Sequence, residues 1–192
     1  MYVEALLPEI ERRYGRPREI ALEFEFQPHG FARVQESLSR GRAHDVTLLI
    51  REGDRLAVIR KPSYPPHVFR APSGGVARGE EFEAGVRREA YEETGLEVAL
   101  ERYLLRVRAA FTCDGRRAEW VTHVVLCRAL SGEPRPVDTR EVCEARWATL
   151  EEVRTSLREA LLATGSGGLA YRAALQEAAL EAMEGPAGGP VG

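Results

Sequence analysis

Residues 74–96 read GGVARGEEFEAGVRREAYEETGL, and this stretch decides how the rest of the chain is interpreted. It opens on a glycine-rich turn, where missing side chains allow sharp bends and close backbone approach. The spacing then predicts a helix from about Glu81 to Thr94, and Gly95 is well placed to end it. A glycine turn that leads into a charged helix therefore stands at the centre of the sequence.

Three carboxylates crowd the last turn of this predicted helix. Glu89, Glu92 and Glu93 stand at positions i, i+3 and i+4, which places them on one helical face. Like charges repel there, and the negative end of the helix dipole disfavours them further. Glu89 and Glu93 also continue the apolar stripe that begins at Phe82, so we expect them to point inward. A divalent cation bound to substrate phosphates would balance these charges, because hard cations prefer carboxylate oxygens.

The segment resembles the Nudix box, G-x5-E-x7-R-E-U-x-E-E-x-G-U, in which U is an apolar residue. The fixed positions are all filled, by Gly74, Glu80, Arg88, Glu89, Glu92, Glu93 and Gly95, with Ala90 and Leu96 at the apolar positions. A match at so many fixed positions is specific. The resemblance implies the Nudix fold of class α/β, an α/β/α sandwich around a mixed β-sheet, with an N-terminal helix-strand extension and a C-terminal helix.

The resemblance also implies a metal site. By position, the metal ligands are Glu89, Glu92 and Glu93, with a backbone carbonyl of the Ser73/Gly74 turn as a further ligand. The expected ion is Mg²⁺, or Mn²⁺ in its place. Such an ion neutralises the diphosphate and lowers the pKa of a bound water molecule.

Other residues of the box receive supporting roles from the resemblance. Arg88 joins Glu92 and Glu93 in the predicted catalytic set, because an arginine beside ligating carboxylates can fix their geometry. Glu80 and Gly95 are predicted structural supports. The general base stays open between Glu92 and Glu93 of the helix and four loop carboxylates, namely Glu133, Asp138, Glu141 and Glu144.

The elements around the box are predicted from hydrophobic periodicity and turn residues. Helices are expected at 3–14, 31–40, 81–94, 150–163 and 169–183, and strands at 19–26, 45–50, 55–60, 68–71, 98–112, 119–129 and 145–148. Residues 1–42 form the predicted extension, which completes a sheet or makes a homodimer contact. Residues 43–163 form the predicted hydrolase domain, and residues 164–192 a C-terminal helix with a Gly/Pro tail.

Composition excludes several classes of partner. The 192 residues include 27 basic and 30 acidic ones, and the net charge of -3 argues against broad nucleic-acid binding. No apolar run approaches the roughly 20 residues that a membrane span requires. The N-terminus lacks the features of a signal peptide. We therefore expect a cytoplasmic protein whose partner is a nucleotide-type small molecule, with no nucleic acid and no membrane among its partners.

The expected activity is metal-dependent hydrolysis of a diphosphate linkage in a nucleoside diphosphate derivative. Candidate substrates are a nucleoside triphosphate, a nucleotide sugar or ADP-ribose, and substrate-binding residues stay unassigned. Phe69 and Arg70 directly precede the box and are candidates for touching substrate. Trp120 and Trp147 are interpreted as core residues rather than base-stacking ones.

Two alternatives stay open at this point. One is a Nudix-fold sensor that binds a nucleotide metabolite without hydrolysing it. The other is a Nudix-fold isomerase of isoprenoid diphosphates, which would use a different metal site with cysteine and glutamate. The chain has three cysteines that could be ligands of such a site, Cys113, Cys127 and Cys143.

Overall fold

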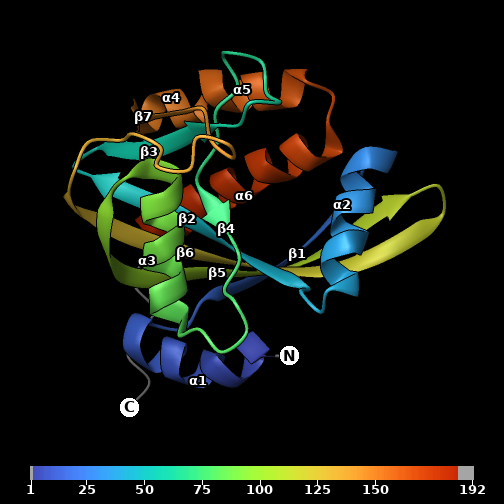
Figure 1. The fold of residues 1–192 in the computed structure, drawn as a ribbon, viewed down its shortest axis with the longest axis horizontal. Coiled ribbons are helices and arrows are strands. Elements are labelled where there is room, and N and C mark those ends of the chain that lie inside the picture. The colour runs from blue at the N-terminus through green and yellow to red at the C-terminus, as the bar shows by residue number, and fades with distance from the viewer. Residues whose placement is uncertain (1, 186–192) are drawn as a thin grey trace.

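A mixed sheet forms the centre of the molecule (Figure 1). The structure is a computed structural model, which describes residues 2–185 and their side chains from residue 5 onward. Within that part, the sheet has seven strands. Six of them run in the order β1-β5-β6-β2-β3-β7, and the seventh, β4, pairs with β2. They are β1 (Arg18–Glu25), β2 (His44–Glu52), β3 (Arg55–Arg60), β4 (Ser73–Gly74), β5 (Glu97–Cys113), β6 (Arg116–Ser131) and β7 (Glu144–Thr149). The pairs β1–β5 and β2–β6 are parallel, and the others are antiparallel.

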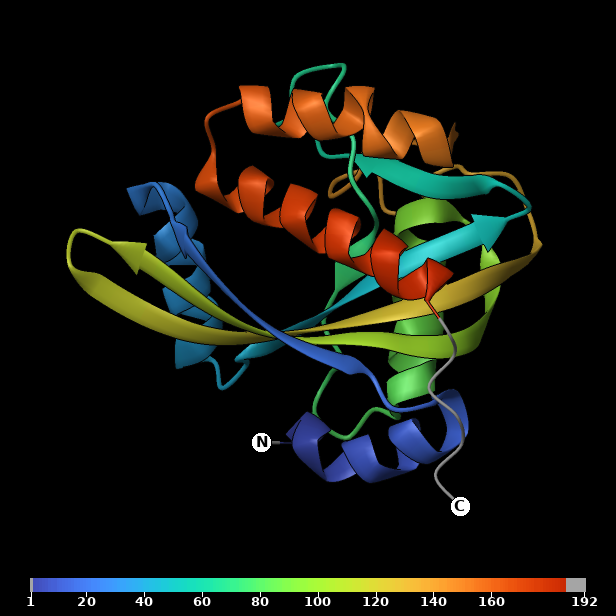
Figure 2. The same ribbon diagram turned by 180° about the vertical axis from the view of Figure 1, so that it is seen from behind.

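Helices cover both faces of the sheet, which confirms the predicted α/β/α sandwich (Figures 1 and 2). They are α1 (Tyr2–Tyr14), α2 (Pro28–Ser39), α3 (Phe82–Thr94), α4 (Leu150–Arg154), α5 (Ser156–Ala163) and α6 (Gly167–Glu184). Helices α1 and α3 pack on one face, while α6, with α4 and α5 beside it, packs on the other. No helix within residues 2–185 is long and apolar enough to cross a membrane.

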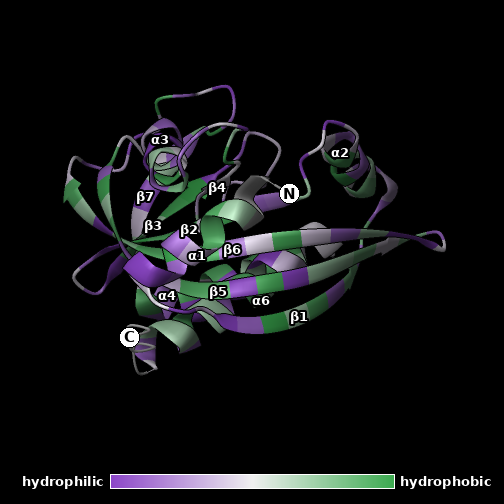
Figure 3. Cartoon of the chain, turned by 90° about the horizontal axis from the view of Figure 1, so that it is seen from below, coloured by the Kyte–Doolittle hydropathy of each residue, from purple (hydrophilic) through white to green (hydrophobic). Residues whose placement is uncertain are grey.

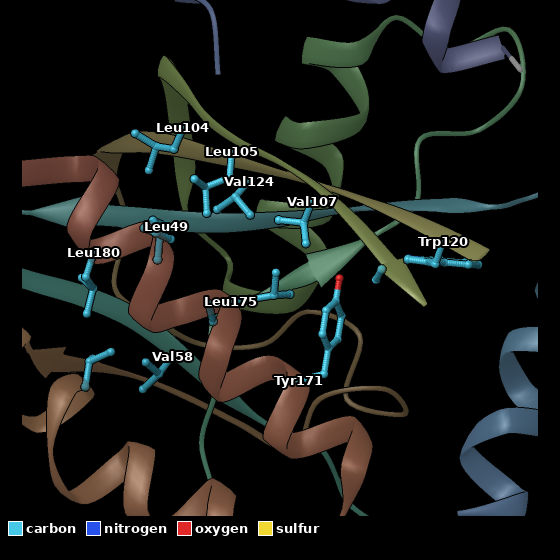
Figure 4. Close-up of a cluster of buried hydrophobic side chains, with 14 of the residues drawn as sticks. Leu49, Val58, Leu104, Leu105, Val107, Trp120, Val124, Tyr171, Leu175 and Leu180 are labelled. Carbon is cyan, nitrogen blue, oxygen red and sulfur yellow. The ribbon is translucent and has the colours of Figure 1, made fainter. Parts of the chain in front are cut away.

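Each face of the sheet has its own hydrophobic core. Side chains of β2 alternate between the two, because successive residues of a strand point to opposite faces. Leu49 packs towards α6, whereas Leu48 and Ile50 pack towards α3. Figure 4 shows the core between the sheet and α6, where Leu175 and Leu180 of α6 face side chains of the strands. The same alternation appears as hydrophobic and hydrophilic bands along β1, β5 and β6 (Figure 3).

The N-terminal and C-terminal segments meet beside the sheet. The Gln27 side chain donates to the carbonyl of Gly165 at 2.8 Å and accepts from the amide of Gly167 at 3.1 Å. Gly167 lies so close to the end of β1 that a Cβ atom would stand 1.8 Å from the carbonyl oxygen of Glu25. The start of α2 is therefore fixed against the start of α6.

Several expected boundaries differ from the structure. The helix expected at 150–163 is interrupted at Thr155, whose φ of -112° and ψ of -94° are not helical. The strand expected at 68–71 is reduced to one bridge between Arg70 and Ile59. The helix expected at 31–40 begins earlier, at Pro28, whose fixed φ suits the first turn. The two-residue β4 was not expected, and residues 186–192 of the predicted tail lie outside the described residues.

Candidate active site

A cleft of about 980 Å³ opens beside β4. Strands β2 and β3 pair only at two positions next to their turn, so further along β4 takes the place beside β2. The glycine turn and the end of α3 both contribute to the cleft, through Ser73, Gly74, Gly75, Arg88, Glu89, Glu92 and Glu93. The structure thus brings the predicted catalytic and metal-binding residues to one cavity.

Glu93 is the buried member of the carboxylate group. Its exposed fraction is 4 %, and its Oε2 accepts a hydrogen bond from the amide of Ser73 at 2.7 Å. Lys61 Nζ lies 3.8 Å and Arg70 Nη2 3.9 Å from its Oε1. Burial raises the pKa of Glu93, while the charges of Arg70 and Lys61 oppose that rise. A carboxylate held in this way has little freedom to turn away from the cleft.

Glu89 lies against the glycine turn. The amide of Gly75 donates to Glu89 Oε1 at 3.0 Å. A Cβ atom at Gly74 would stand 1.9 Å from Glu89 Cδ, so any larger residue there would displace the carboxylate. The glycine that opens the box therefore provides the space in which Glu89 lies.

Arg88 joins the turn to the helix. Its Nη1 donates to Glu89 Oε1 at 2.9 Å and to Glu92 Oε2 at 3.1 Å. Its Nε donates to Glu80 Oε1 at 2.9 Å, and its Nη2 donates to the carbonyl of Gly75 at 2.8 Å. The hydrogen bond from Arg88 lowers the pKa of Glu80. Glu80 lies two residues before α3 and is joined to the helix by this ion pair.

The C-terminal end of α3 is capped by a distant loop. Gly95 has a left-handed φ of 69°, and a Cβ atom there would stand 2.5 Å from the carbonyl oxygen of Arg135. The amide of Arg135 donates to the carbonyl of Thr94 at 2.7 Å. The amide of Asp138 donates to the carbonyl of Glu92 at 3.0 Å. These bonds satisfy helix-end carbonyls beside the carboxylates and bring the loop to the cleft.

Only two of the four loop carboxylates that were candidates for the general base line the cleft. Asp138 and Glu141 line the cleft, and Glu141 lies 3.5 Å from Lys61 Nζ. Glu133 and Glu144 are not among the described residues that line it. Glu144 instead pairs with Arg60 at 3.0 Å.

The carboxylates do not form a ready-made metal centre. Across the described residues, no three His, Cys, Asp or Glu side chains are grouped closely enough to hold an ion. Glu89 and Glu92 are instead bridged by Arg88, and Glu93 accepts from Ser73. Their chemistry nevertheless suits a hard divalent cation, because three carboxylates share one turn of helix at the cleft.

Several cleft residues had no signal in the sequence. They come from both terminal segments, from β2 and from the loop after β3, and include Phe26, His29, Arg33, Asp45, Tyr64, Tyr171 and Arg172. Lys61, the one lysine of the chain, also lines the cleft, and its rarity is a signal that could have pointed to it.

The two residues that the sequence brought forward for substrate contact separate in the structure. Arg70 lines the cleft, whereas Phe69 lies in the core with Arg146 over its ring. Trp120 belongs to the core, as expected, and its side chain also lines the cleft. Trp147 is not part of the described lining. The three cysteines are absent from that lining as well.

Known proteins resemble this chain in the same region. The NUDIX domain family matches residues 40–165. The chain is 34 % identical over 116 residues to the NAD-capped RNA hydrolase NudC of Mycobacterium tuberculosis (strain ATCC 25618 / H37Rv), covering 58 % of this chain and 34 % of that protein. It is 30 % identical over 113 residues to the human mitochondrial NAD(P)H pyrophosphatase NUDT13, covering 57 % of this chain and 30 % of that protein. The chain thus spans about a third of the length of these curated relatives.

Two solved structures can also be compared with this chain. An ADP-ribose pyrophosphatase from Streptococcus suis 89-1591 superposes with a TM-score of 0.49 at 17 % identity, covering 74 % of this chain and 92 % of that one. A MutT NUDIX hydrolase from Burkholderia pseudomallei superposes with a TM-score of 0.45 at 30 % identity, covering 57 % and 84 %. The family match over residues 40–165, with every fixed position of the box filled, shows that this chain belongs to the Nudix family.

Proposed function

We propose that this chain hydrolyses a diphosphate linkage in a nucleotide derivative, and that it needs a divalent cation to do so. The observation that carries the proposal is the buried carboxylate of Glu93, held beside Glu89 and Glu92 at the wall of a large cleft. Burying a carboxylate costs free energy unless a cation or hydrogen bonds compensate. Mg²⁺ fits these oxygen ligands, and Mn²⁺ accepts the same set.

The residues of the chain have separate tasks in this proposal. Glu89, Glu92 and Glu93 would hold the cation, which when bound supplies a Lewis acid for the diphosphate and lowers the pKa of a water molecule. Arg88 orients Glu89 and Glu92 through its hydrogen bonds to both. Asp138 and Glu141, which line the cleft, are the loop candidates for accepting a proton from water.

The cleft and the relatives both support a substrate class. A volume of about 980 Å³ accommodates a diphosphate with a group on each side. The names of two relatives, an NAD-capped RNA hydrolase and an NAD(P)H pyrophosphatase, refer to substrates of this kind. We therefore favour a nucleoside diphosphate joined to a second group. A homodimer, a cytoplasmic location and the division at residues 42 and 163 stay predictions.

A substrate panel tests the proposal. The panel contains nucleoside triphosphates, nucleotide sugars, ADP-ribose, NADH and an NAD-capped RNA, each with Mg²⁺, with Mn²⁺ or with EDTA. We expect phosphate, pyrophosphate or nucleotide release from at least one compound, only when a metal is present. A chain that binds one compound tightly but hydrolyses none would instead be a sensor, and hydrolysis in EDTA would contradict the metal requirement.

A further inference from the structure

An ion pair lies on the floor of the cleft, outside the Nudix box. Arg172 of α6 donates from Nη2 to Asp45 Oδ2 at 2.9 Å and from Nη1 to Thr47 Oγ1 at 3.1 Å. Asp45 also accepts from Trp120 Nε1 at 2.9 Å and from the hydroxyl of Thr122. Burial alone would raise the pKa of Asp45, but the charge of Arg172 and these hydrogen bonds outweigh burial and lower it. The pair is therefore ionised, and the guanidinium is fixed at two of its nitrogen atoms.

This arrangement is not explained by stability. Both charged groups of a buried ion pair lose their hydration. Replacing such a pair with packed apolar residues is often neutral or stabilising. The guanidinium has five N–H groups, and its two hydrogen bonds within the described residues use two of them. The Arg172 side chain keeps 21 % of its surface exposed and lines the cleft. A fixed guanidinium with donors to spare at a cleft wall is suited to binding an anion.

Arg172 lies close to the box glutamates. Thr47, which accepts from Arg172, is paired with Ser73 between β2 and β4. The amide of Ser73 donates in turn to Glu93. Two residues therefore connect the guanidinium with the buried carboxylate.

Other cations surround the same part of the floor. Arg70 Nε donates to the hydroxyl of Tyr64 at 3.3 Å. Burial would raise the pKa of Tyr64, but the charges of Arg70, Arg172 and Lys61 outweigh it and lower the pKa. Arg70 is already bonded to the carbonyl of Ala71 at 2.6 Å, and Lys61 lies between two carboxylates. Arg172 makes two hydrogen bonds within the described residues, whereas Arg70 makes three and is only 3 % exposed, so Arg172 offers more donors to a ligand in the cleft.

We propose that Arg172 contacts the substrate and binds the phosphate group next to the one held at the glutamates. This inference rests on the proposed function, because it assumes a diphosphate in the cleft. The planar fork of an arginine matches two phosphate oxygens and forms strong charge-assisted hydrogen bonds. Asp45 and Thr47 act as positioning residues. Helix α6 lies outside the matched residues 40–165, so this anchor comes from the chain's own C-terminal segment.

Binding of ADP in EDTA tests the anchor without the metal. A Trp147→Phe background leaves Trp120, which shares Asp45 with Arg172, as the fluorescent reporter. We expect Arg172→Gln to weaken ADP binding about tenfold, the loss of one charge-assisted hydrogen bond. Arg158→Gln is the matched control, because it removes an exposed ion pair between α5 and Glu177 of α6.

A second variant keeps the test valid if Arg172→Gln fails to fold. The double change Asp45→Asn with Arg172→Gln removes both buried charges and retains two hydrogen-bonding amides. Wild-type ADP affinity in this folded variant would overturn the proposal, and so would an absence of ADP binding by the wild type in EDTA. With metal and substrate, we expect KM to rise about tenfold while kcat changes little, because this contact binds rather than reacts.

The two proposals fail in distinguishable ways. If the wild type hydrolyses nothing but its ADP affinity depends on Arg172, the anchor stands and the proposed hydrolysis is wrong. If the wild type hydrolyses a substrate and both variants keep its KM and the ADP affinity, the anchor alone is wrong.

Discussion

Gly74 lies directly against Glu89, since a Cβ atom at position 74 would stand 1.9 Å from Glu89 Cδ. The φ angle of Gly74 is not left-handed, in contrast to that of Gly95. Space for a carboxylate, rather than backbone conformation, is therefore what requires glycine at the start of the box. This separates two kinds of glycine that look alike in the sequence.

Replacing Gly74 by alanine should reduce activity more than stability. The new methyl group would displace the Glu89 carboxylate from the amide of Gly75, and disturbances beside a metal ligand, the role proposed for Glu89, typically cost about 10- to 100-fold. Steady-state hydrolysis measures the effect. Gly185→Ala is the control, because its Cβ would meet its nearest atoms at an ordinary 3.6 Å. Equal activity in both variants would show that Glu89 does not depend on this space.

Replacing Gly95 by alanine should reduce stability. A left-handed φ costs a non-glycine residue about 1–2 kcal/mol, and here the Cβ would also stand 2.5 Å from the carbonyl oxygen of Arg135. Gly115→Ala isolates the first cost, because Gly115 has a φ of 72° with open space around it. We expect a larger loss of unfolding free energy for Gly95→Ala in urea. An equal loss in the two variants would contradict the close approach.

Substitutions at the neighbouring residues Arg88 and Arg87 should affect hydrolysis to very different extents. Arg88→Gln removes hydrogen bonds to Glu80, Glu89 and Glu92, so hydrolysis should fall about 10- to 100-fold. Arg87 makes an exposed ion pair with Glu83, and Arg87→Gln should change little. Comparing kcat of the two variants checks the assignment. Wild-type kcat in Arg88→Gln would remove Arg88 from the site.

Stability should fall in mild acid because of one buried histidine. His123 lies 2.5 Å from the hydroxyl of Tyr103, and burial lowers its pKa from 6.5 to about 3. The unfolded chain binds a proton below about pH 6.5, whereas the folded chain does so only near pH 3, so acidification favours unfolding. Above pH 6.5, His123 does not lower the free energy of unfolding. Below pH 6.5, its protonation in the unfolded chain lowers that free energy by up to about 1.4 kcal/mol per pH unit.

Urea unfolding at pH 7 and pH 5 checks this prediction. The wild type should lose about 2 kcal/mol more between these values than His123→Gln does. His67→Gln, at an exposed position, should behave like the wild type. The same pH dependence in the wild type and in His123→Gln would assign the acid sensitivity to other groups.

The sequence predicts best what neighbouring residues determine. The α3 helix and its end at Gly95 follow from local spacing, and the structure confirms both. The interruption at Thr155 carries no glycine or proline to mark it. The contact between Arg172 and Asp45 joins positions 127 residues apart, which no local pattern specifies. The cleft floor could therefore not be predicted, although the glutamates at its wall could.

The most direct measurement is the kcat of Glu93→Gln for a substrate identified in the panel, in saturating Mn²⁺. Removing the buried ligand charge at Glu93 should lower kcat at least about 100-fold, while the thermal midpoint stays close to that of the wild type. Glu81→Gln, an exposed change just before the same helix, should keep wild-type kcat. Full activity in Glu93→Gln would contradict the proposed metal site.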